Sequence, residues 1–226
     1  MRFLCLHGMG TNSRIYEMQT AAIRYGLDSQ HTYEFIDGTV PTVAAHGIES
    51  IAGPNEQFLQ YSDPESLESV AKALYDLEKL VDEEGPFDGV MAFSSGAALA
   101  ASLMVHKLQK DPEKERLSPV FRCAIFLCGG PPEDPLGAIS GQRRRMDFES
   151  DGEIIKIPTA HIWGANDQLY PTFGPVLSKL CCSDLRSDYI HDGGHEIPGP
   201  KDPKAVIKAV HVINRAIERA LVDQSQ

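Results

Sequence analysis

The 226-residue sequence lacks long hydrophobic runs. No segment approaches the roughly 20 consecutive apolar residues that a membrane-spanning helix requires. The apolar stretch at residues 2–6 is too short for the core of a signal peptide, and no small-residue cleavage site follows it. We therefore expect a soluble, cytoplasmic protein with no membrane partner.

Cysteine is also scarce, with five residues in all: Cys5, Cys123, Cys128, Cys181 and Cys182. An odd number in a chain of this length favours reduced, buried thiols over disulfides. None of the five has a histidine or a second cysteine at the short, regular spacing of a zinc site, and the adjacent pair is not a ligand pair. We expect no bound metal.

Basic residues are outnumbered, 21 lysines and arginines against 32 aspartates and glutamates, for a formal net charge of -11. Such a charge disfavours binding to phosphate backbones. The one dense basic run, residues 143–145, is short and has acidic neighbours, so it is interpreted as a solvated loop face. We expect no nucleic-acid partner.

Strand-like and helix-like segments alternate along the whole chain. Strands are expected at residues 2–6, 33–37, 89–93, 121–128, 157–164 and 188–191, and helices at 15–24, 66–84, 95–109, 173–181 and 204–221. Residues 111–119 and 137–151 are expected to be polar loops. Without repeats or a linker, this alternation predicts one domain over residues 1–226, of the α/β class, with a mostly parallel sheet covered by helices on both faces.

Regular periodicity fails between residues 38 and 66, although apolar side chains persist there. A long irregular segment of this kind in a compact domain is more often functional than idle, with a plain structural loop as the alternative. We expect a small lid-like insertion that, together with Leu169, Tyr170 and Pro171, roofs an apolar pocket. The residues expected to contact a substrate are Phe58, Tyr61, Leu169, Tyr170 and Ile197.

One stretch, residues 89–100, joins an apolar strand to an alanine-rich helix through a serine. Small residues, Ala92 and Gly96, lie two positions before and two positions after Ser94. They suit a turn so sharp that the strand and helix backbones approach closely and the turning residue is strained. This pattern is the nucleophile elbow, G-x-S-x-G, with alanine replacing the first glycine. Ser94 is therefore a candidate nucleophile, and a helix cap is the alternative.

Suitable partners for Ser94 follow two later strands. Asp167 comes directly after the strand at 157–164, and His195 lies in a glycine-rich loop after the strand at 188–191. In a parallel sheet the carboxyl ends of the strands lie at one edge, where reactive groups collect. The order serine, aspartate, histidine is that of α/β hydrolases.

These residue types are the ones that acyl transfer needs. A serine hydroxyl is a poor nucleophile unless an imidazole removes its proton, and a carboxylate orients that imidazole and stabilises its charged form. The negative oxygen of the intermediate needs fixed backbone donors. We expect these to be the N–H groups of Ser95 and Met9, with His7 as a buried residue that orients the loop of Met9. Such a site needs no cofactor.

Other residues of the same types could fill these roles, but none has the same context. Ser95 lies within the first helical turn, Cys128 has no base near it in the pattern, and His191 lies within a strand. The competing aspartates do not directly follow the strand before the histidine strand. They are Asp134, Asp184 and Asp192.

Motifs spread over nearly the whole chain resemble the fungal serine hydrolases of FSH type. They are FLCLHG at residues 3–8, GPFDGV at 85–90, FSSGA at 93–97, GAND at 164–167 and GGHEIP at 193–198. The chain departs from the family pattern at Ala92, where glycine is usual, and at Ser95, where glutamine is usual. An aromatic pair common in the family is weak here, with Phe58 and Tyr61 as the nearest equivalents.

The resemblance implies an α/β-hydrolase fold and an esterase or thioesterase that acts on acyl groups. Many such fungal proteins look like stand-alone hydrolases of polyketide biosynthesis, which release an acyl chain from the thioester of an acyl carrier protein. A general carboxylesterase or lactone hydrolase acting on small free esters is the alternative within the same class. A non-catalytic protein of hydrolase fold that binds a ligand is the alternative from another class.

Overall fold

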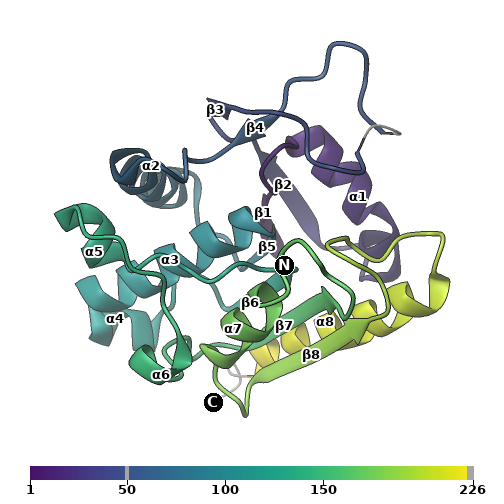
Figure 1. Cartoon of the computed structure of the whole chain (residues 1–226). Coiled ribbons are helices and arrows are strands. Elements are labelled where there is room, and N and C mark those ends of the chain that lie inside the picture. Colours follow the sequence, from purple (N-terminus) through teal and green to yellow (C-terminus); the bar gives the residue numbers. More distant parts are fainter. Residues whose placement is uncertain (49–50, 223–226) are drawn as a thin grey trace.

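Six parallel strands form the central sheet of the protein (Figure 1). The structure is a computed structural model, and it describes residues 1–48 and 51–222. The domain expected over residues 1–226 and the insertion expected over 38–66 also include positions 49–50 and 223–226, which lie outside the described residues. The strand order is β2–β1–β5–β6–β7–β8. The strands are β1 (Arg2–Leu6), β2 (Thr32–Ile36), β5 (Gly89–Phe93), β6 (Cys123–Leu127), β7 (Thr159–Gly164) and β8 (Arg186–His191).

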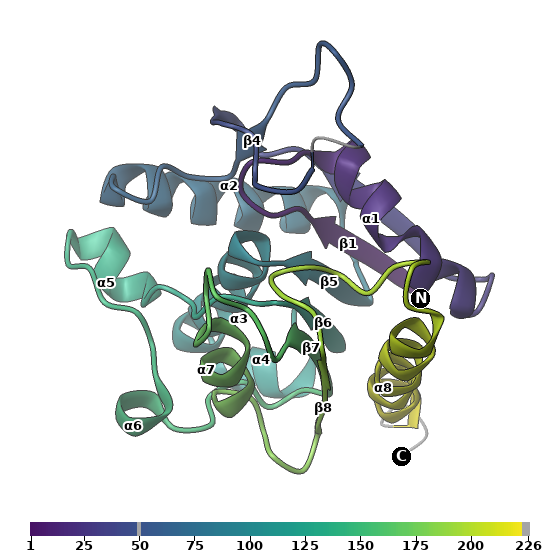
Figure 2. The same ribbon diagram turned by 45° about the vertical axis from the view of Figure 1, so that its right-hand side comes forward.

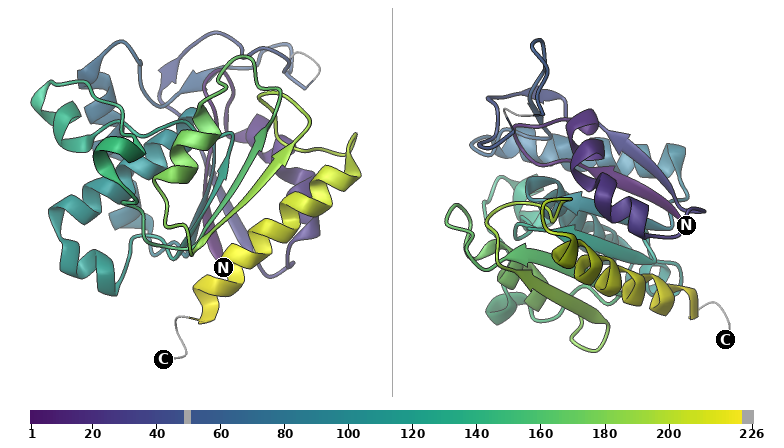
Figure 3. Two further views of the ribbon diagram at one scale, coloured as in Figure 1. Left: turned by 60° about the horizontal axis from the view of Figure 1, so that its bottom comes forward. Right: turned by 90° about the vertical axis from the view of Figure 1, so that its right-hand side faces the viewer.

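Helices cover both faces of this sheet, as the alternating pattern predicts. On one face lie α1 (Ser13–Gly26) and α8 (Pro203–Val222), and on the other lie α2 (Leu67–Glu84), α3 (Ser95–Lys110) and α7 (Phe173–Lys179) (Figure 3). All five residues of β5 and all five of β6 are buried. Strands covered on both sides read as continuous apolar runs, and this explains their composition. The expected α/β fold is confirmed.

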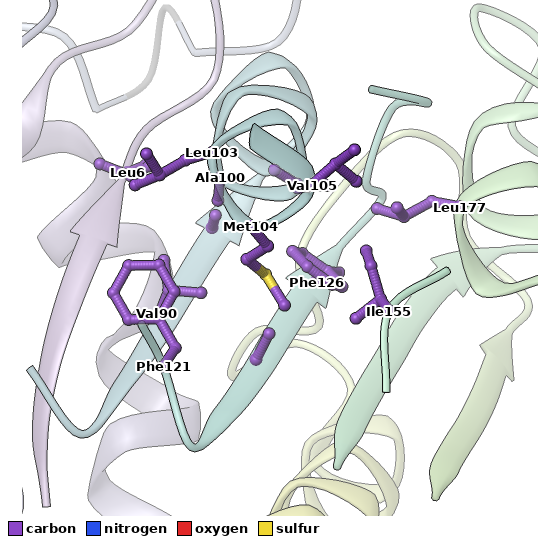
Figure 4. Close-up of a cluster of buried hydrophobic side chains, with 14 of the residues drawn as sticks. Leu6, Val90, Ala100, Leu103, Met104, Val105, Phe121, Phe126, Ile155 and Leu177 are labelled. Atoms are coloured by element: carbon purple, nitrogen blue, oxygen red, sulfur yellow. The ribbon is translucent and has the colours of Figure 1, made fainter. Parts of the chain in front are cut away.

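The core on the α3 face is made of aliphatic and aromatic side chains from strands and helices that are distant in sequence. Val90 and Phe126 from the sheet lie beneath Leu103 and Met104 of α3, and Leu177 of α7 extends the same layer (Figure 4). Burial of each large side chain of this kind contributes on the order of 1.5 to 3 kcal/mol. The two central strands and α3 are therefore held as one packed unit.

Two segments expected to be polar loops contain helices. Residues 111–119 include α4 (Pro112–Leu117). The side chain of Asp111 caps this helix by accepting a hydrogen bond from the Lys114 N–H, and a proline follows in the first turn. Residues 137–151 include most of α5 (Pro135–Ser140) and all of α6 (Phe148–Asp151), on the same side of the molecule as α3 and away from α8 (Figure 2). The loop expectation was wrong because the apolar pattern is weak in such short helices, whereas their capping residues are clear.

The irregular segment contains one short antiparallel pair, β3 (Val40–Pro41) with β4 (Leu59–Gln60). It is attached to the loop after β1, because the N–H groups of Gly10 and Leu59 donate to the carbonyls of Leu59 and Thr11 respectively. The insertion thus lies against the carboxyl end of β1.

The chain order makes the carboxyl ends of β1 and β5 a switch point of the sheet. From β1 the chain passes outward to β2, and it later returns to place β5 on the other side of β1. Loops that leave neighbouring strands in opposite directions open a crevice beyond their carboxyl ends. The loop after β1 and the turn after β5 meet at this point.

A buried histidine makes the fold sensitive to acid. His161 in β7 is 1% exposed and its Nε2 lies 3.0 Å from the Thr159 hydroxyl. Burial lowers the pKa of His161 to about 3, below the 6.5 of an unfolded chain. As the pH decreases, His161 is protonated in the unfolded chain before it is protonated in the folded protein. Its contribution to the free energy of unfolding is therefore fully present above pH 6.5 and is lost as the pH decreases below that value.

We predict that this residue alone lowers the free energy of unfolding by about 2 kcal/mol between pH 7 and pH 5. Denaturant unfolding of His161→Asn should show a correspondingly flatter pH dependence over that interval. His211→Asn, at an exposed position of α8, is the control and should retain the wild-type slope. Equal slopes for wild type and His161→Asn would contradict the prediction.

Candidate active site

Ser94 occupies a strained turn between β5 and α3. Its backbone has φ 53° and ψ -115°, and its side chain makes no capping hydrogen bond to α3. The turn is held from β6, because the Ser94 N–H donates to Leu127 O at 3.0 Å and the Gly130 N–H donates to Ser94 O at 3.1 Å. Strained residues at such positions persist only where the surroundings fix them. The helix-cap alternative for Ser94 has no support in this geometry.

Gly96 is required by the approach of α3 to β1. A Cβ atom at this position would lie 2.5 Å from His7 O and 2.7 Å from Leu6 O, both backbone atoms that cannot move aside. Any larger residue would push the helix away from the strand. The sharp elbow and the loop after β1 are therefore held together by the absence of a side chain at position 96.

Ser94, His195 and Asp167 form a continuous hydrogen-bonded chain. The Ser94 hydroxyl lies 2.8 Å from Nε2 of His195, and Nδ1 of the same ring lies 2.6 Å from Asp167 Oδ2. The side chains of His195 and Asp167 are 9% and 5% exposed. The other Asp167 oxygen accepts from the N–H groups of Leu169 and Tyr170, which fixes the carboxylate. An arrangement of this kind can remove the serine proton as the oxygen attacks a carbonyl.

The loops after β7 and β8 are bonded to each other, which fixes the positions of Asp167 and His195 relative to one another. Gly164 ends β7, and a Cβ atom there would overlap the carbonyl oxygens of Gly193 and Gly194 in the histidine loop. Asn166 bonds to the same loop through its N–H to Gly193 O at 3.0 Å and its side-chain amide to Asp192 O at 2.6 Å. The G-A-N-D motif therefore joins the two loops as well as supplying Asp167.

Aromatic rings surround the histidine. The ring centroid of Tyr170 lies 4.7 Å from that of His195, that of Phe93 lies at 5.2 Å and that of Phe173 lies at 6.2 Å. Tyr170 also stacks on Phe173 at 4.5 Å. These rings restrict the His195 ring to the orientation that its two hydrogen bonds require.

The loop after β1 is positioned by a buried histidine. His7 is fully buried; its Nε2 accepts a hydrogen bond from the Gly38 N–H at 2.8 Å, and its Nδ1 lies 2.8 Å from Gly8 O. Burial lowers the pKa of His7, which favours the neutral ring. Because Nε2 accepts a hydrogen bond, the ring proton lies on Nδ1, which donates to Gly8 O. His7 thus links the loop to the start of the insertion.

The backbone N–H of Met9 points toward the elbow and donates to the Ser95 hydroxyl at 2.9 Å. Ser95 begins α3, where the first N–H groups of a helix have no partner within the helix. Of the two backbone groups expected to stabilise a negative oxygen, the Ser95 N–H directly follows Ser94 in the chain, and the Met9 N–H is bonded to the Ser95 side chain.

A cavity of about 140 Å³ opens beside the elbow, on the α3 face. Its walls come from the end of the irregular insertion, α2, α3, the loop after β6, α5, the segment after α5, and α7. The residues that line it are Ser62, Pro64, Val70, Leu74, Ser95, Ala98, Leu99, Ser102, Gly130, Pro131, Glu133, Pro135, Ala138, Arg145 and Phe173.

The residues expected to contact a substrate lie elsewhere than in this cavity lining. Tyr170 packs on His195, and Leu169 beside it is 63% exposed. The Tyr61 hydroxyl donates to Ile36 O and accepts from the His7 N–H, which anchors the end of β1. Phe58 accepts a backbone bond from Thr42, and Ile197 packs against the core on the opposite face of the sheet.

Apart from Ser95, and from Ser62 and Pro64 of the insertion, the residues that line the cavity carry no signal of a site in the sequence. Leu74 of α2 both belongs to the buried core and lines the cavity, so its apolar character does not distinguish the two. A glycine-proline cluster after the strand at 121–128, residues 129–132, was the available signal of a loop at the carboxyl edge of the sheet.

The competing residues occupy other environments. Cys128 is 1% exposed and burial raises its pKa to about 12, so its thiol stays protonated. Asp134 forms an ion pair with Arg144. His191 is 4% exposed and accepts the Gly193 N–H at Nδ1.

A larger cavity, of about 790 Å³, lies at the opposite ends of the strands. Its lining includes Pro86, Arg122 and Pro158, which precede β5, β6 and β7. It is remote from Ser94, so the candidate active site is identified by its reactive side chains and not by the size of the cavity.

Among the described residues, no cluster of three or more His, Cys, Asp or Glu side chains could hold a metal ion. Within residues 1–48 and 51–222, every helix is too short or too polar to cross a membrane.

Known proteins similar to this chain were found by sequence and by structure. Esterase FPY3 of Fusarium mangiferae is 39% identical over 98% of this chain and 97% of its own length, and Hydrolase phiM of Fungal sp. (strain ATCC 74256) is 32% identical over 97% and 94%. A carboxylesterase from Mesorhizobium loti shares the fold, with a TM-score of 0.58 and 18% identity over 94% of this chain and 88% of that protein. The family model described as serine hydrolase (FSH1) matches residues 1–207. The chain belongs to the FSH1 serine hydrolase family and is a serine hydrolase of the esterase type.

Proposed function

We propose that the protein hydrolyses acyl esters and thioesters through an acyl-enzyme on Ser94. The Ser94 oxygen attacks the carbonyl carbon while Nε2 of His195 takes its proton, and His195 then gives that proton to the departing alcohol or thiol. Asp167 holds Nδ1 of the ring and stabilises the imidazolium. A water molecule repeats the sequence on the acyl-enzyme and releases the acid and free Ser94.

The single observation that carries this proposal is the pair of short contacts through one buried imidazole. The distances of 2.8 Å from His195 Nε2 to the Ser94 hydroxyl and of 2.6 Å from Nδ1 to Asp167 support the assignment of His195 as the base and of Asp167 as its orienting carboxylate. The strained backbone of Ser94 adds support, since a serine serving only to pack would not require it.

The backbone N–H groups of Ser95 and Met9 are the proposed donors to the negative oxygen. One donor removed from such a site costs about 10²- to 10³-fold in rate. The N-terminal end of α3 also favours negative charge. The Ser95 hydroxyl, which accepts the Met9 N–H in the free protein, must release it before Met9 can bind the substrate oxygen.

For the leaving group we propose the thiol of a carrier-protein thioester that holds a polyketide-type acyl chain. The support is the resemblance to fungal hydrolases of this type. The small free ester is the second candidate, favoured by the modest volume of the cavity beside the elbow. The chemistry at Ser94 is the same for both.

We predict that Ser94→Ala lowers kcat/KM for a nitrophenyl ester and for a short acyl thioester by about 10⁴-fold or more. The reason is loss of the nucleophile, with the rest of the site intact. Steady-state hydrolysis by purified protein is the measurement, and Ser118→Ala, at an exposed position, is the control that should retain wild-type rates. Unchanged hydrolysis by Ser94→Ala would overturn the proposal.

The same assay with carrier-bound and free thioesters of one acyl group distinguishes the two proposed leaving groups. Equal kcat/KM for the two thioesters would reject the proposal that the substrate is bound to a carrier protein.

A second prediction concerns Ser95. Ser95→Ala removes the hydroxyl that accepts the Met9 N–H, so this donor no longer has to exchange one hydrogen bond for another. We expect kcat/KM to rise about two- to tenfold, the value of one ordinary hydrogen bond. A fall in kcat/KM, measured with the same nitrophenyl ester, would show instead that the Ser95 hydroxyl assists the reaction.

A further inference from the structure

We propose that the cavity beside Ser94 selects acyl groups that carry a hydroxyl group at their far end. This inference rests on the proposed function, because it assigns the cavity to the acyl part of the substrate. Its basis is a largely apolar lining that also contains Ser102, Glu133 and Arg145, polar side chains at a distance from the elbow; Ser95 at the elbow and Ser62 are the other polar residues of the lining.

Residues adjoining the reacting serine line the cavity. Its lining includes Ser95, the next residue, and Gly130, whose N–H bonds to Ser94 O. Phe173, which lines it too, packs near His195. An acyl group on Ser94 therefore has direct access to this space.

The walls next to the elbow are apolar. Ala98 and Leu99 of α3 face Val70 and Leu74 of α2 across the cavity lining, with Phe173 near the entrance. These side chains bind hydrocarbon, and the Ser95 hydroxyl at the elbow already accepts the Met9 N–H. A polar substituent placed in this part would lose its bonds to water without replacement.

The far end is polar and lies two helical turns away. Ser102 follows Ser95 by seven residues on α3, which corresponds to about 10 Å along the helix. Its hydroxyl donates to Glu133 O at 3.1 Å, which fixes the segment after β6 at this point. The Glu133 and Arg145 side chains complete this end of the cavity.

One oxygen of the Glu133 carboxylate has no hydrogen-bond donor among the described residues. Oε1 lies 3.5 Å from Nε of Arg145, a long contact, while Oε2 is buried and has no hydrogen-bond partner among the described residues. A buried acceptor left without a donor costs free energy, so a ligand that supplies a donor is bound more tightly. Arg145 offers N–H donors at the same place.

A hydroxyl group matches both side chains. The hydroxyl can donate a hydrogen bond to Glu133 Oε2 while its oxygen accepts one from Arg145. A carboxylate would be repelled by Glu133, and an ammonium group would be repelled by Arg145. The volume, about 140 Å³, is close to the roughly 150 Å³ of a cavity that binds benzene. The occupant that fits best is one ring or a short chain with a terminal hydroxyl.

The test compares nitrophenyl esters that differ only at the far end of the acyl group. They are 4-phenylbutanoate, its para-hydroxy derivative and its para-methoxy derivative, which can accept but cannot donate. We expect the wild-type protein to prefer the hydroxy ester over the other two by about tenfold in kcat/KM, the range of a hydrogen bond to a charged group. In Glu133→Gln this preference, measured as the ratio of kcat/KM for the hydroxy ester to kcat/KM for plain 4-phenylbutanoate, should fall at least fivefold. Glu149→Gln, an exposed acid on α6, is the matched control and should keep the preference.

Binding of the two free acids to Ser94→Ala protein, measured by calorimetry, makes the comparison without catalysis. Tighter binding of the hydroxy acid, lost in the Ser94→Ala, Glu133→Gln double variant, supports the inference even if the proposed function fails. Equal hydrolysis or equal binding of the hydroxy and unsubstituted compounds would overturn it, as would a preference that survives in Glu133→Gln. Hydrolysis no faster in wild type than in Ser94→Ala would reject the proposed function alone.

Discussion

The close approach of α3 to β1 is the constraint on which the rest of the site depends. Gly96 allows it, because any Cβ at that position would overlap the backbone carbonyls of Leu6 and His7. The approach forces Ser94 into a backbone conformation that costs about 1 to 3 kcal/mol in general. The buried packing of β5, β6 and α3 offsets that cost, and the Ser94 side chain is held out at the carboxyl edge of the sheet.

The remaining groups are positioned relative to this fixed point by hydrogen bonds between loops. The acid and the histidine come from two neighbouring strands whose loops are joined through Gly164 and Asn166. The loop of Met9 is held by His7, which bonds to Gly38, and by the Met9 N–H itself, which bonds to Ser95. These bonds fix the Asp167–His195 pair relative to Ser94, whereas the Met9 N–H is already bonded to the Ser95 hydroxyl.

Much of the fold and of the reactive centre could be predicted from the sequence, because short-range rules determine them. The strands after which Ser94, Asp167 and His195 lie are marked by apolar runs, and parallel strands bring their ends to one edge. The short helices α4 and α6 were missed because they bury little apolar surface, although Asp111 and Asp147 mark their starts. The cavity could not be predicted, because its walls depend on how α2 and the segment after β6 pack against α3. Residues such as Val70 and Leu74 look the same whether they face a core or a cavity.

Ser95, where the chain departs from the family pattern, contacts both the loop after β1 and the cavity. A serine there is short enough to accept the Met9 N–H and to leave open the cavity that starts beside it. Position 95 therefore lies between the Met9 N–H and the cavity. A change of side chain at this one position can affect both the rate and the choice of substrate.

The most direct test of the central claim is the intact mass of the protein after treatment with a fluorophosphonate, followed by peptide mapping of the labelled site. A reactive serine activated by His195 and Asp167 should gain one phosphonyl group per chain, located on Ser94, and His195→Ala should lose the rapid labelling. Labelling at another residue, or equal labelling of wild type and His195→Ala, would contradict the mechanism derived from this geometry.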